Sequence, residues 1–294
     1  MPSLKEVRTR ITSVNSTQQI TSAMKMVAAS KLRRAQMAIV NMRPYAKKLN
    51  EILQNVTSSL DSGDENSFGD ERPIHKVLIV AVSSNRGLCG AFNANIVKQT
   101  QKLLSDEFAA LNQKGNVDII TIGKKVTDFF SKKDYHHIAS YDDFFNELTF
   151  ENIAPLADEL LQQYKDLKYD KIIIVYNQFK NAASQYVMAE QLLPVVPSEK
   201  EEDDKSNNNF IFEPSQKEII ENLLPSILKT QFYKTLLDSY ASEHGARMTA
   251  MQQATDNAQE MLKDLKLTYN KARQASITGE ILEIVGGAEA LKNA

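Results

Sequence analysis

The fold is decided near the C-terminal end of the chain, by residues 251–276, MQQATDNAQEMLKDLKLTYNKARQAS. Apolar or small residues recur there at steps that alternate between four and three: Met251, Thr255, Ala258, Leu262, Leu265, Tyr269, Ala272 and Ser276. This heptad pattern is typical of a helix that packs along another helix in a coiled coil. A helix on a globular core shows a similar stripe, but such helices usually run about 8 to 20 residues. The length of the stripe therefore favours a long helical pair.

The same helix is expected to begin well before the heptads. Ser215 and Glu218 have the spacing of a capping box, and no glycine follows until Gly245. Pro225 is unfavourable inside a helix, where it costs about 3 kcal/mol. The sequence therefore predicts a C-terminal helix over residues 215–290, with a kink or break near Leu224.

The beginning of the chain predicts the second long helix, over residues 1–57. Glycine is absent from Ser3 to Val56, and Pro44 should kink the helix or be absorbed by bending. Two apolar stripes have helical spacing, the first formed by Leu4, Val7, Ile11 and Val14 and the second by Ala38, Met42, Tyr45, Leu49, Ile52 and Val56. Between them, Ile20, Met24 and Val27 keep a helical period in an altered register.

The middle of the chain has a different pattern, which predicts an α/β domain over residues 74–196. Short runs rich in β-branched residues, at 77–82, 117–122 and 171–178, alternate with helical patterns at 94–111, 124–132 and 150–167. This alternation predicts a parallel, Rossmann-like sheet, and the run 186–193 is expected to add one antiparallel edge strand. Polar, acidic connectors are expected at 58–73 and 197–214.

A domain inserted between two helices fixes their direction if they pair, because the chain leaves and returns at the same end. The fold class expected is therefore α/β, with a long antiparallel coiled coil of N- and C-terminal helices and an inserted Rossmann-like domain. At 1.5 Å per residue the helices would be about 80 Å and about 105 Å long, so the C-terminal helix should overhang its partner.

Composition narrows the functional classes. The 294 residues are 42% hydrophobic and 24% charged with a net charge of −2, which is ordinary for a folded protein and disfavours a globally basic nucleic-acid binder. A single cysteine, Cys89, excludes an intramolecular disulfide framework, a Cys-rich zinc site and a Cys-x-x-Cys pair. No apolar run reaches the roughly 18 residues that span a bilayer.

The charge is unevenly distributed. Ten basic and two acidic residues give the first 56 residues a net charge of +8, and the rest of the chain sums to −10. A presequence would also be basic, but this pattern continues well past the usual presequence length. Within it, Lys31 and Arg34 share one helix face and Arg33 is rotated from it. Because the overall charge is near neutral and no aromatic residues are interleaved, an acidic protein partner is favoured over nucleic acid, and a plain solvated helix face remains the alternative.

No sequence motif points clearly to a catalytic, nucleotide or metal site. The turn SSNRGLCG at residues 83–90 follows a strand and precedes a helix, where α/β folds often bind phosphate, but it lacks the Gly-Lys-Ser/Thr of a P-loop and the first glycine of a dinucleotide fingerprint. A structural turn is therefore favoured over a nucleotide site, with Cys89 as a packing residue. The four histidines have no metal-ligand spacing, and no carboxylate pair suggests acid–base catalysis.

Several stretches resemble the γ subunit of F-type ATP synthases along essentially the whole chain. They are the start VRTRI at 7–11 with TQQITSAMKMVAASKL at 17–32, the turn at 84–93, ATDNA at 254–258, YNKARQ at 269–274 and ITGEILEIVGGAEA at 277–290. The resemblance implies a non-catalytic rotor shaft without a cofactor, whose paired helices stand inside a ring of α and β subunits. Proton flow would turn the shaft with the c-ring and so couple proton movement to ATP synthesis or hydrolysis.

The resemblance also implies contacts with partners, residue by residue. Met24, Lys31, Arg33 and Arg34 would meet acidic lever segments of β, with Arg247 opposite them on the C-terminal helix. Arg273, Gln274, Thr278 and Glu280 would lie near the loops that grip the shaft. Subunit ε and the c-ring are further implied partners, on the cytoplasmic face of a bacterial plasma membrane, and there is no room for a transit peptide before the family pattern.

Two other functions compete with this interpretation. One is a nucleotide-binding α/β enzyme that uses the turn at 84–90 and dimerises through its helices. The other is a basic coiled-coil protein that binds nucleic acid with a steep salt dependence. A rotor shaft predicts that the isolated chain binds no nucleotide.

Overall fold

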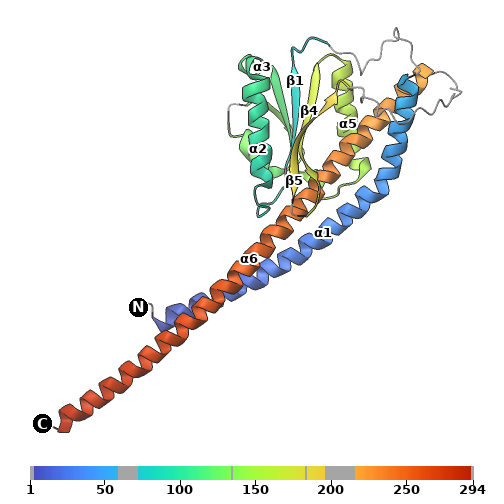
Figure 1. Ribbon diagram of the computed structural model, residues 1–294. Helices are drawn as coiled ribbons and strands as arrows, with labels where there is room; N and C mark the ends of the chain where they lie inside the picture. Colours follow the sequence, from blue (N-terminus) through green and yellow to red (C-terminus); the bar gives the residue numbers. More distant parts are fainter. Residues whose placement is uncertain (1–2, 59–71, 134, 183, 196–215, 293–294) are drawn as a thin grey trace. The chain divides into compact units, whose positions relative to one another are not determined.

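A computed structural model describes residues 3–58, 72–133, 135–182, 184–195 and 216–292 (Figure 1). The chain divides into two compact units, one formed by Met1–Ala28 with Met248–Ala294 and the other by Ala29–Arg247. Two long helices, α1 (Leu4–Ser58) and α6 (Gln216–Lys292), contribute to both units. The predicted acidic connectors, 58–73 and 197–214, lie almost entirely outside the described residues.

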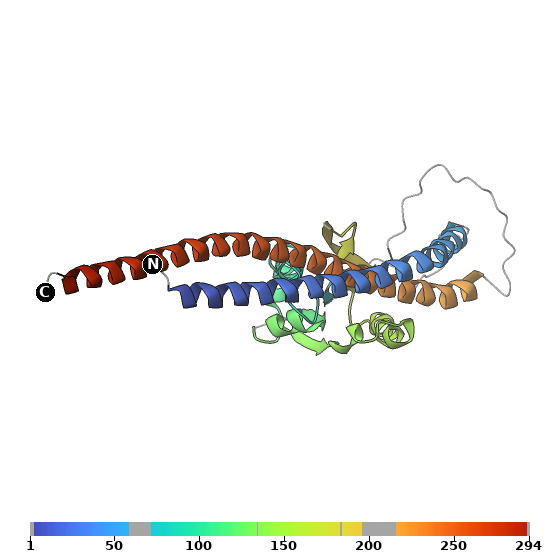
Figure 2. The same ribbon diagram turned by 90° about the horizontal axis from the view of Figure 1, so that it is seen from below.

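In the first unit, α1 and α6 run side by side in opposite directions, as both views show (Figures 1 and 2). The predicted heptad residues of α6 are all buried or half-buried, whereas most residues between them are exposed, so the heptad prediction is confirmed. Beyond Ser276 the described side chains of α6 are nearly all exposed, and the helix continues past the N-terminus of α1, as the predicted overhang requires (Figure 2).

The middle register predicted for α1 is wrong. Ile20 and Val27 are 60% and 58% exposed, whereas Thr21 and Ala28, one position later in each case, are buried. Small residues at these positions allow two helix backbones to approach closely, and this requirement outweighs the greater hydrophobicity of the neighbouring side chains. Apolar spacing alone therefore assigned the wrong face.

Neither proline breaks its helix. α1 is continuous through Pro44 and α6 through Pro225, so the break expected near Leu224 is absent. Leu224, Ile227 and Leu228 around Pro225 are buried, and their burial offsets the cost of the hydrogen bond that proline removes.

The second unit contains a five-stranded sheet in the order β3-β2-β1-β4-β5. All neighbouring strands are parallel except β5, which pairs antiparallel with β4, as predicted. The strands are β1 (Val77–Val82), β2 (Val117–Ile122), β3 (His137–Ser140), β4 (Lys171–Phe179) and β5 (Gln185–Leu193). The predicted fold class is confirmed, although β3 was missed because four residues are too few to show a clear period.

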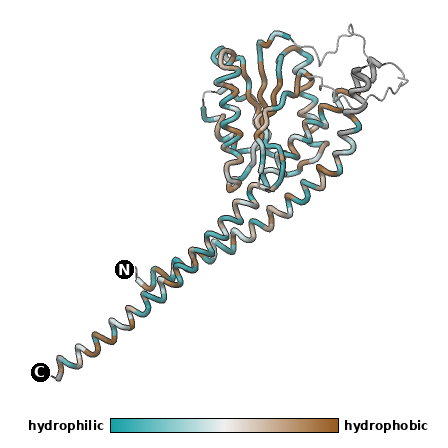
Figure 3. The backbone as a smooth tube through the Cα atoms, viewed as in Figure 1, coloured by the Kyte–Doolittle hydropathy of each residue, from teal (hydrophilic) through white to brown (hydrophobic). Residues whose placement is uncertain are grey.

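The sheet carries an apolar layer on each face, and Figure 3 shows hydrophobic colour concentrated in the strands. Alternate residues of β1 enter the two layers: Leu78, Val80 and Val82 face one, and Val77, Ile79 and Ala81 face the other. The first layer is completed by α5 (Phe150–Lys165) and by residues 224–236 of α6. The second is completed by α2 (Phe92–Lys102), α4 (Lys124–Phe130) and the segment between α2 and β2.

The helix predicted over 94–111 is divided. A π-helical turn at Leu103–Glu107 separates α2 from α3 (Ala109–Gln113), and a short 3₁₀ turn, Asp143–Phe145, follows β3. Leu103, Leu104 and Phe108 remain buried through the irregular turn, because it rotates their side chains onto the sheet.

Candidate functional site

The sheet has a topological switch point between β1 and β4, because the chain leaves β1 toward β2 and later returns to the other side of β1 as β4. In open α/β folds the crevice at the carboxyl ends of such strands is the usual place for a ligand. Here α6 occupies it. Ser242 Oγ donates a hydrogen bond to the carbonyl oxygen of Asn177 in β4 over 3.0 Å, and residues 241–247 are almost all buried.

The turn after β1 is fixed by its own side chains. Asn93, at the start of α2, accepts a hydrogen bond from the Ser84 backbone N–H over 3.0 Å and donates one to the Cys89 thiol over 3.2 Å. Leu88 and Gly90 have positive φ angles of 62° and 61°, in the left-handed region that non-glycine residues rarely adopt. Cys89 is buried, which agrees with its interpretation as a packing residue.

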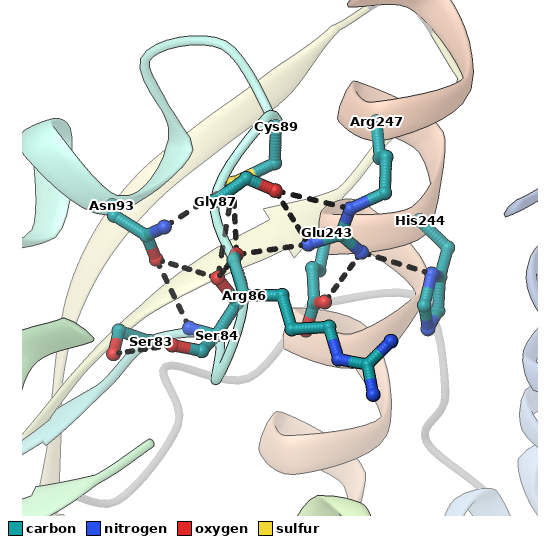
Figure 4. A network of polar contacts seen from close by, with 9 residues as sticks. All are labelled: Ser83, Ser84, Arg86, Gly87, Cys89, Asn93, Glu243, His244 and Arg247. Atoms are coloured by element: carbon teal, nitrogen blue, oxygen red, sulfur yellow. Dashed lines mark hydrogen bonds and ion pairs between the residues drawn. The ribbon is translucent and has the colours of Figure 1, made fainter. Parts of the chain in front are cut away.

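Arg247 of α6 joins the helix to this turn (Figure 4). Its Nη2 atom donates to the carbonyl oxygens of Arg86 and Gly87 over 3.0 Å and 3.2 Å, and its Nε atom donates to that of Gly87 over 3.3 Å. Its Nη1 atom pairs with Glu243 Oε1 over 2.6 Å and donates to His244 Nδ1 over 3.3 Å. The guanidinium is nearly buried, and its donors are used within the chain.

Burial controls the ionisation of this cluster. It raises the pKa of Glu243, and the positive charges of Arg247, Lys31 and Arg86 partly offset the rise. Burial, together with Arg247 and Lys31, lowers the pKa of His244 to about 3, so the ring is neutral at neutral pH. Because Nδ1 accepts from Arg247, the ring proton belongs on Nε2, which is buried and has no hydrogen-bond partner among the described residues.

The chemistry of the turn does not suit a nucleotide. A phosphate site needs backbone N–H groups that converge on the anion, whereas this turn directs two carbonyl oxygens at a guanidinium. The helix that carries Arg247 also occupies the crevice where a nucleotide would lie. The structure therefore does not favour the nucleotide-binding enzyme.

The predicted basic face of α1 lies beside the same cluster. Lys31 and Arg34 are exposed. Burial raises the pKa of Tyr240 on α6, and the charge of Arg34 partly offsets this rise, whereas the charge of Lys31 adds to the effect of burial in lowering the pKa of His244. Arg33 is also exposed, on a helix face rotated from that of Lys31 and Arg34. The structure thus brings Lys31, Arg34 and Arg247 together around one buried segment of α6.

The other predicted site residues belong to the first unit. Met24 is half-buried, whereas Arg273, Gln274, Thr278 and Glu280 are exposed on the last part of α6. Thr278 Oγ1 donates to the Gln274 carbonyl oxygen over 2.9 Å, and Glu280 Oε1 accepts from Ser276 Oγ over 3.4 Å, so both contacts lie within the helix.

Three residues of this region were not predicted: Glu243, which pairs with Arg247, Ser242, which bonds to β4, and Asn93, which fixes the turn. Glu243 and Arg247 are four residues apart, and this spacing of opposite charges on a helix was a usable signal. For Ser242 the sequence carried no signal, because its partner Asn177 lies 65 positions away. The partners of Asn93 are near in sequence, Ser84 nine positions and Cys89 four positions before it, but such turn contacts have no period that reveals them. Across the described ranges, no cluster of three or more His, Cys, Asp or Glu side chains has a metal-binding arrangement.

Comparison with known proteins identifies the family. The family profile described as ATP synthase matches residues 3–291. The ATP synthase gamma chain of Flavobacterium johnsoniae is 56% identical over 291 residues, which are 99% of each chain, and that of Christiangramia forsetii is 54% identical with the same coverage. The matches place this chain in the ATP synthase family. Within that family it belongs with the gamma chains, and it is a subunit of the central stalk.

Solved structures agree with this assignment. A chain from the central stalk and c-ring of Tetrahymena thermophila mitochondrial ATP synthase is 27% identical, with a TM-score of 0.58, over 80% of this chain and 99% of that one. A chain from Euglena gracilis mitochondrial ATP synthase has a TM-score of 0.69 at 22% identity, over 98% and 94%, which supports the fold. None of the helices in the described part of the chain is both long enough and apolar enough to span a bilayer.

Proposed function

We propose that the chain is a rotor shaft that couples proton translocation to ATP synthesis or hydrolysis in a ring of α and β subunits, and that it performs no bond chemistry itself. The observation that carries this proposal is the end of α6. Six large apolar side chains there are 49–82% exposed: Ile277, Ile281, Leu282, Ile284, Val285 and Leu291. An exposed apolar surface of this kind marks a binding site for another protein.

The polar residues just before and within this segment are proposed to meet the loops that hold the shaft. Arg273, Gln274, Thr278 and Glu280 are exposed and available for such contacts, as the family resemblance implies. Met24, on the facing part of α1, is half-buried, so only part of its side chain is available to a partner.

The basic face of α1 is proposed to meet acidic segments of β. Lys31, Arg33 and Arg34 are exposed, and exposed ion pairs contribute only about 0 to 1 kcal/mol each. Weak contacts suit a shaft, because each must form and break in every turn. Arg247 is different, since its side chain is buried and bonded within the chain. We therefore propose that it affects the ring indirectly.

The remaining partners are proposed to be subunit ε and the c-ring, next to the α/β domain of residues 74–196. The terminal helices, 1–57 and 215–290, would then enter the ring. This assignment places the chain at the cytoplasmic face of a bacterial plasma membrane, as a peripheral component. The similar chains from Euglena gracilis belong to structures of F1 with the c-ring and of the rotor, which supports the c-ring as a partner.

Native mass spectrometry of the tagged chain, isolated gently from its own cells, tests the proposal when ATP hydrolysis is assayed on the same sample. We expect an assembly with three α, three β and one copy of this chain, which hydrolyses ATP. Adding ADP or ATP to the isolated chain should give no binding in calorimetry. A small homo-oligomer that binds nucleotide would contradict the proposal and favour the enzyme.

A further inference from the structure

We infer that Arg247 is a positioning residue that locks the turn at residues 84–90 onto α6, so that the carboxyl edge of the sheet acts as a rigid joint between the shaft helix and the α/β domain. The inference rests on the proposed rotor function and adds to it the device that makes the domain turn with the helix. The strongest evidence is that Arg247 and the turn lie far apart in sequence yet share three hydrogen bonds.

The geometry of these bonds restricts rotation. A guanidinium is planar and rigid, and Arg247 engages two successive carbonyl oxygens, those of Arg86 and Gly87, from two of its nitrogens. A lysine ammonium is a point charge on a flexible stem and would not hold both carbonyl groups in one orientation. Glu243 fixes the far side of the guanidinium through a buried ion pair.

A second attachment lies five residues before Arg247 on α6, at Ser242. Ser242 Oγ bonds to the Asn177 carbonyl oxygen in β4, so α6 is tied to both strands that flank the switch point: to β4 directly and to β1 through the turn. Earlier in α6, Phe232 and Leu236 belong to the apolar layer on one face of the sheet. Apolar contacts are non-directional and allow sliding, whereas the two polar attachments fix the angle of the helix.

The backbone of the turn has a strained conformation that needs contacts from the rest of the chain. Leu88 has a φ of 62°, which costs energy for a side chain of its size and persists only where surrounding contacts enforce it. Cys89 beside it is buried and is the only cysteine in the chain. If Arg247 releases the turn, Cys89 should become accessible to reagents, and this gives a local probe of the joint.

The test compares R247K with the wild type in the assembled complex. Modification of Cys89 by N-ethylmaleimide is followed by peptide mass spectrometry, and ATP-driven proton pumping is measured per ATP hydrolysed. We expect R247K to label Cys89 at least tenfold faster and to pump at least twofold fewer protons per ATP hydrolysed. A structural role alone would increase labelling but leave the pumping ratio unchanged, and this outcome would overturn the inference. Labelling within twofold of the wild type would overturn it as well.

The matched control is R72K. Arg72 also donates from Nη2 to a carbonyl oxygen, that of Tyr164, over 3.1 Å, but away from the switch point. Labelling and pumping should stay at wild-type values in this variant. If R247K does not assemble, hydrogen exchange on the wild-type complex tests the inference instead. The Ser84 amide should then exchange as slowly as the amides of residues 242–247. Exchange at the rate of a free loop would overturn the inference. Absence of the chain from any α/β assembly would instead refute the rotor function.

Discussion

The hydroxyl oxygens of Thr21 and Thr255 lie 2.8 Å apart, in a hydrogen bond between α1 and α6 in the first unit. Each hydroxyl also contacts a backbone carbonyl of its own helix, that of Gln18 or Met251. Two small polar side chains thus occupy positions where a coiled coil usually has large apolar ones. The pair allows a close approach of the helices while leaving no hydroxyl unsatisfied.

The first prediction concerns this pair. T255V keeps the volume of the side chain but removes the bond between the helices, and Thr21 can still donate to its own helix. We expect a loss of about 0.5 to 1.5 kcal/mol in the free energy of unfolding. Urea unfolding followed by circular dichroism measures it. T268V is the control, because Thr268 is exposed and its hydroxyl donates to the Asp264 carbonyl oxygen of its own helix. Its effect should stay within about 0.5 kcal/mol. Equal effects of the two variants would contradict the role of the pair.

The second prediction concerns Gly245, which lies against the connection between β4 and β5. A Cβ atom there would be 3.3 Å from both Cα and the carbonyl oxygen of Ala182 and 3.5 Å from the Phe179 ring. G245L should therefore lower the free energy of unfolding by about 2 kcal/mol or more, because overpacking forces the backbone to shift. At Gly279, with no atom within 4 Å of such a Cβ, G279A should instead stabilise the helix by up to about 1 kcal/mol. Thermal unfolding of both variants checks the contrast.

The third prediction concerns acid stability. The pKa of His244 is about 3 in the folded chain and about 6.5 in a free side chain, so the unfolded state binds the proton first as the pH falls. The neutral His244 ring therefore makes its whole contribution to stability above about pH 6.5, and this contribution is lost as the pH falls from about 6.5 to about 3. It is on the order of a few kcal/mol. Glu243 has a raised pKa and changes stability in the opposite direction.

Urea unfolding at a series of pH values measures this loss. H244Q keeps a polar side chain of similar size without a titrating group, so its stability should vary less between pH 6.5 and pH 4 than that of the wild type. H75Q changes an exposed ring and should retain the wild-type profile. If H244Q and the wild type have parallel profiles, His244 is not the group responsible.

The fourth prediction concerns the exposed apolar end of α6. I281S combined with V285S changes two side chains that are 55% and 53% exposed. In the isolated chain the free energy of unfolding should change by less than about 0.5 kcal/mol, because exposed positions tolerate substitution. In the assembled complex the same variant should lower the dissociation temperature, since a partner is expected to cover these side chains. Native mass spectrometry with heating checks both, and an unchanged complex would contradict the proposed contact.

The fifth prediction concerns the basic face of α1. The triple variant K31Q/R33Q/R34Q should assemble but hydrolyse ATP with a weaker dependence on ionic strength, because it lacks three exposed charges that salt would screen. K263Q/K266Q, which removes two exposed charges from α6 in the first unit, is the control. An identical salt dependence in the triple variant and the wild type would exclude an electrostatic role for this face.

Much of the fold was predictable because its signals are local. The strands at 77–82, 117–122 and 171–178 are rich in β-branched residues, which is typical of a parallel sheet buried on both faces. Strand β3 has only four residues with alternating exposure, which is too short a pattern to predict a strand. It is a strand because it pairs with β2. Continuity through Pro225 was likewise unpredictable, because it depends on buried neighbours.

The sequence by itself determined the two long helices, the inserted α/β domain and the family, because heptads, β-branched runs and family motifs are properties of neighbouring residues. Only the tertiary structure decided that Thr21 and Ala28, rather than Ile20 and Val27, form the helix contact, because that choice depends on how closely a second backbone approaches. It also decided that Arg247 is a buried anchor. The residues next to an arginine in sequence do not show whether its side chain is exposed or buried. Here the side chain is buried because it bonds to the carbonyl oxygens of Arg86 and Gly87, which lie about 160 positions away in the chain.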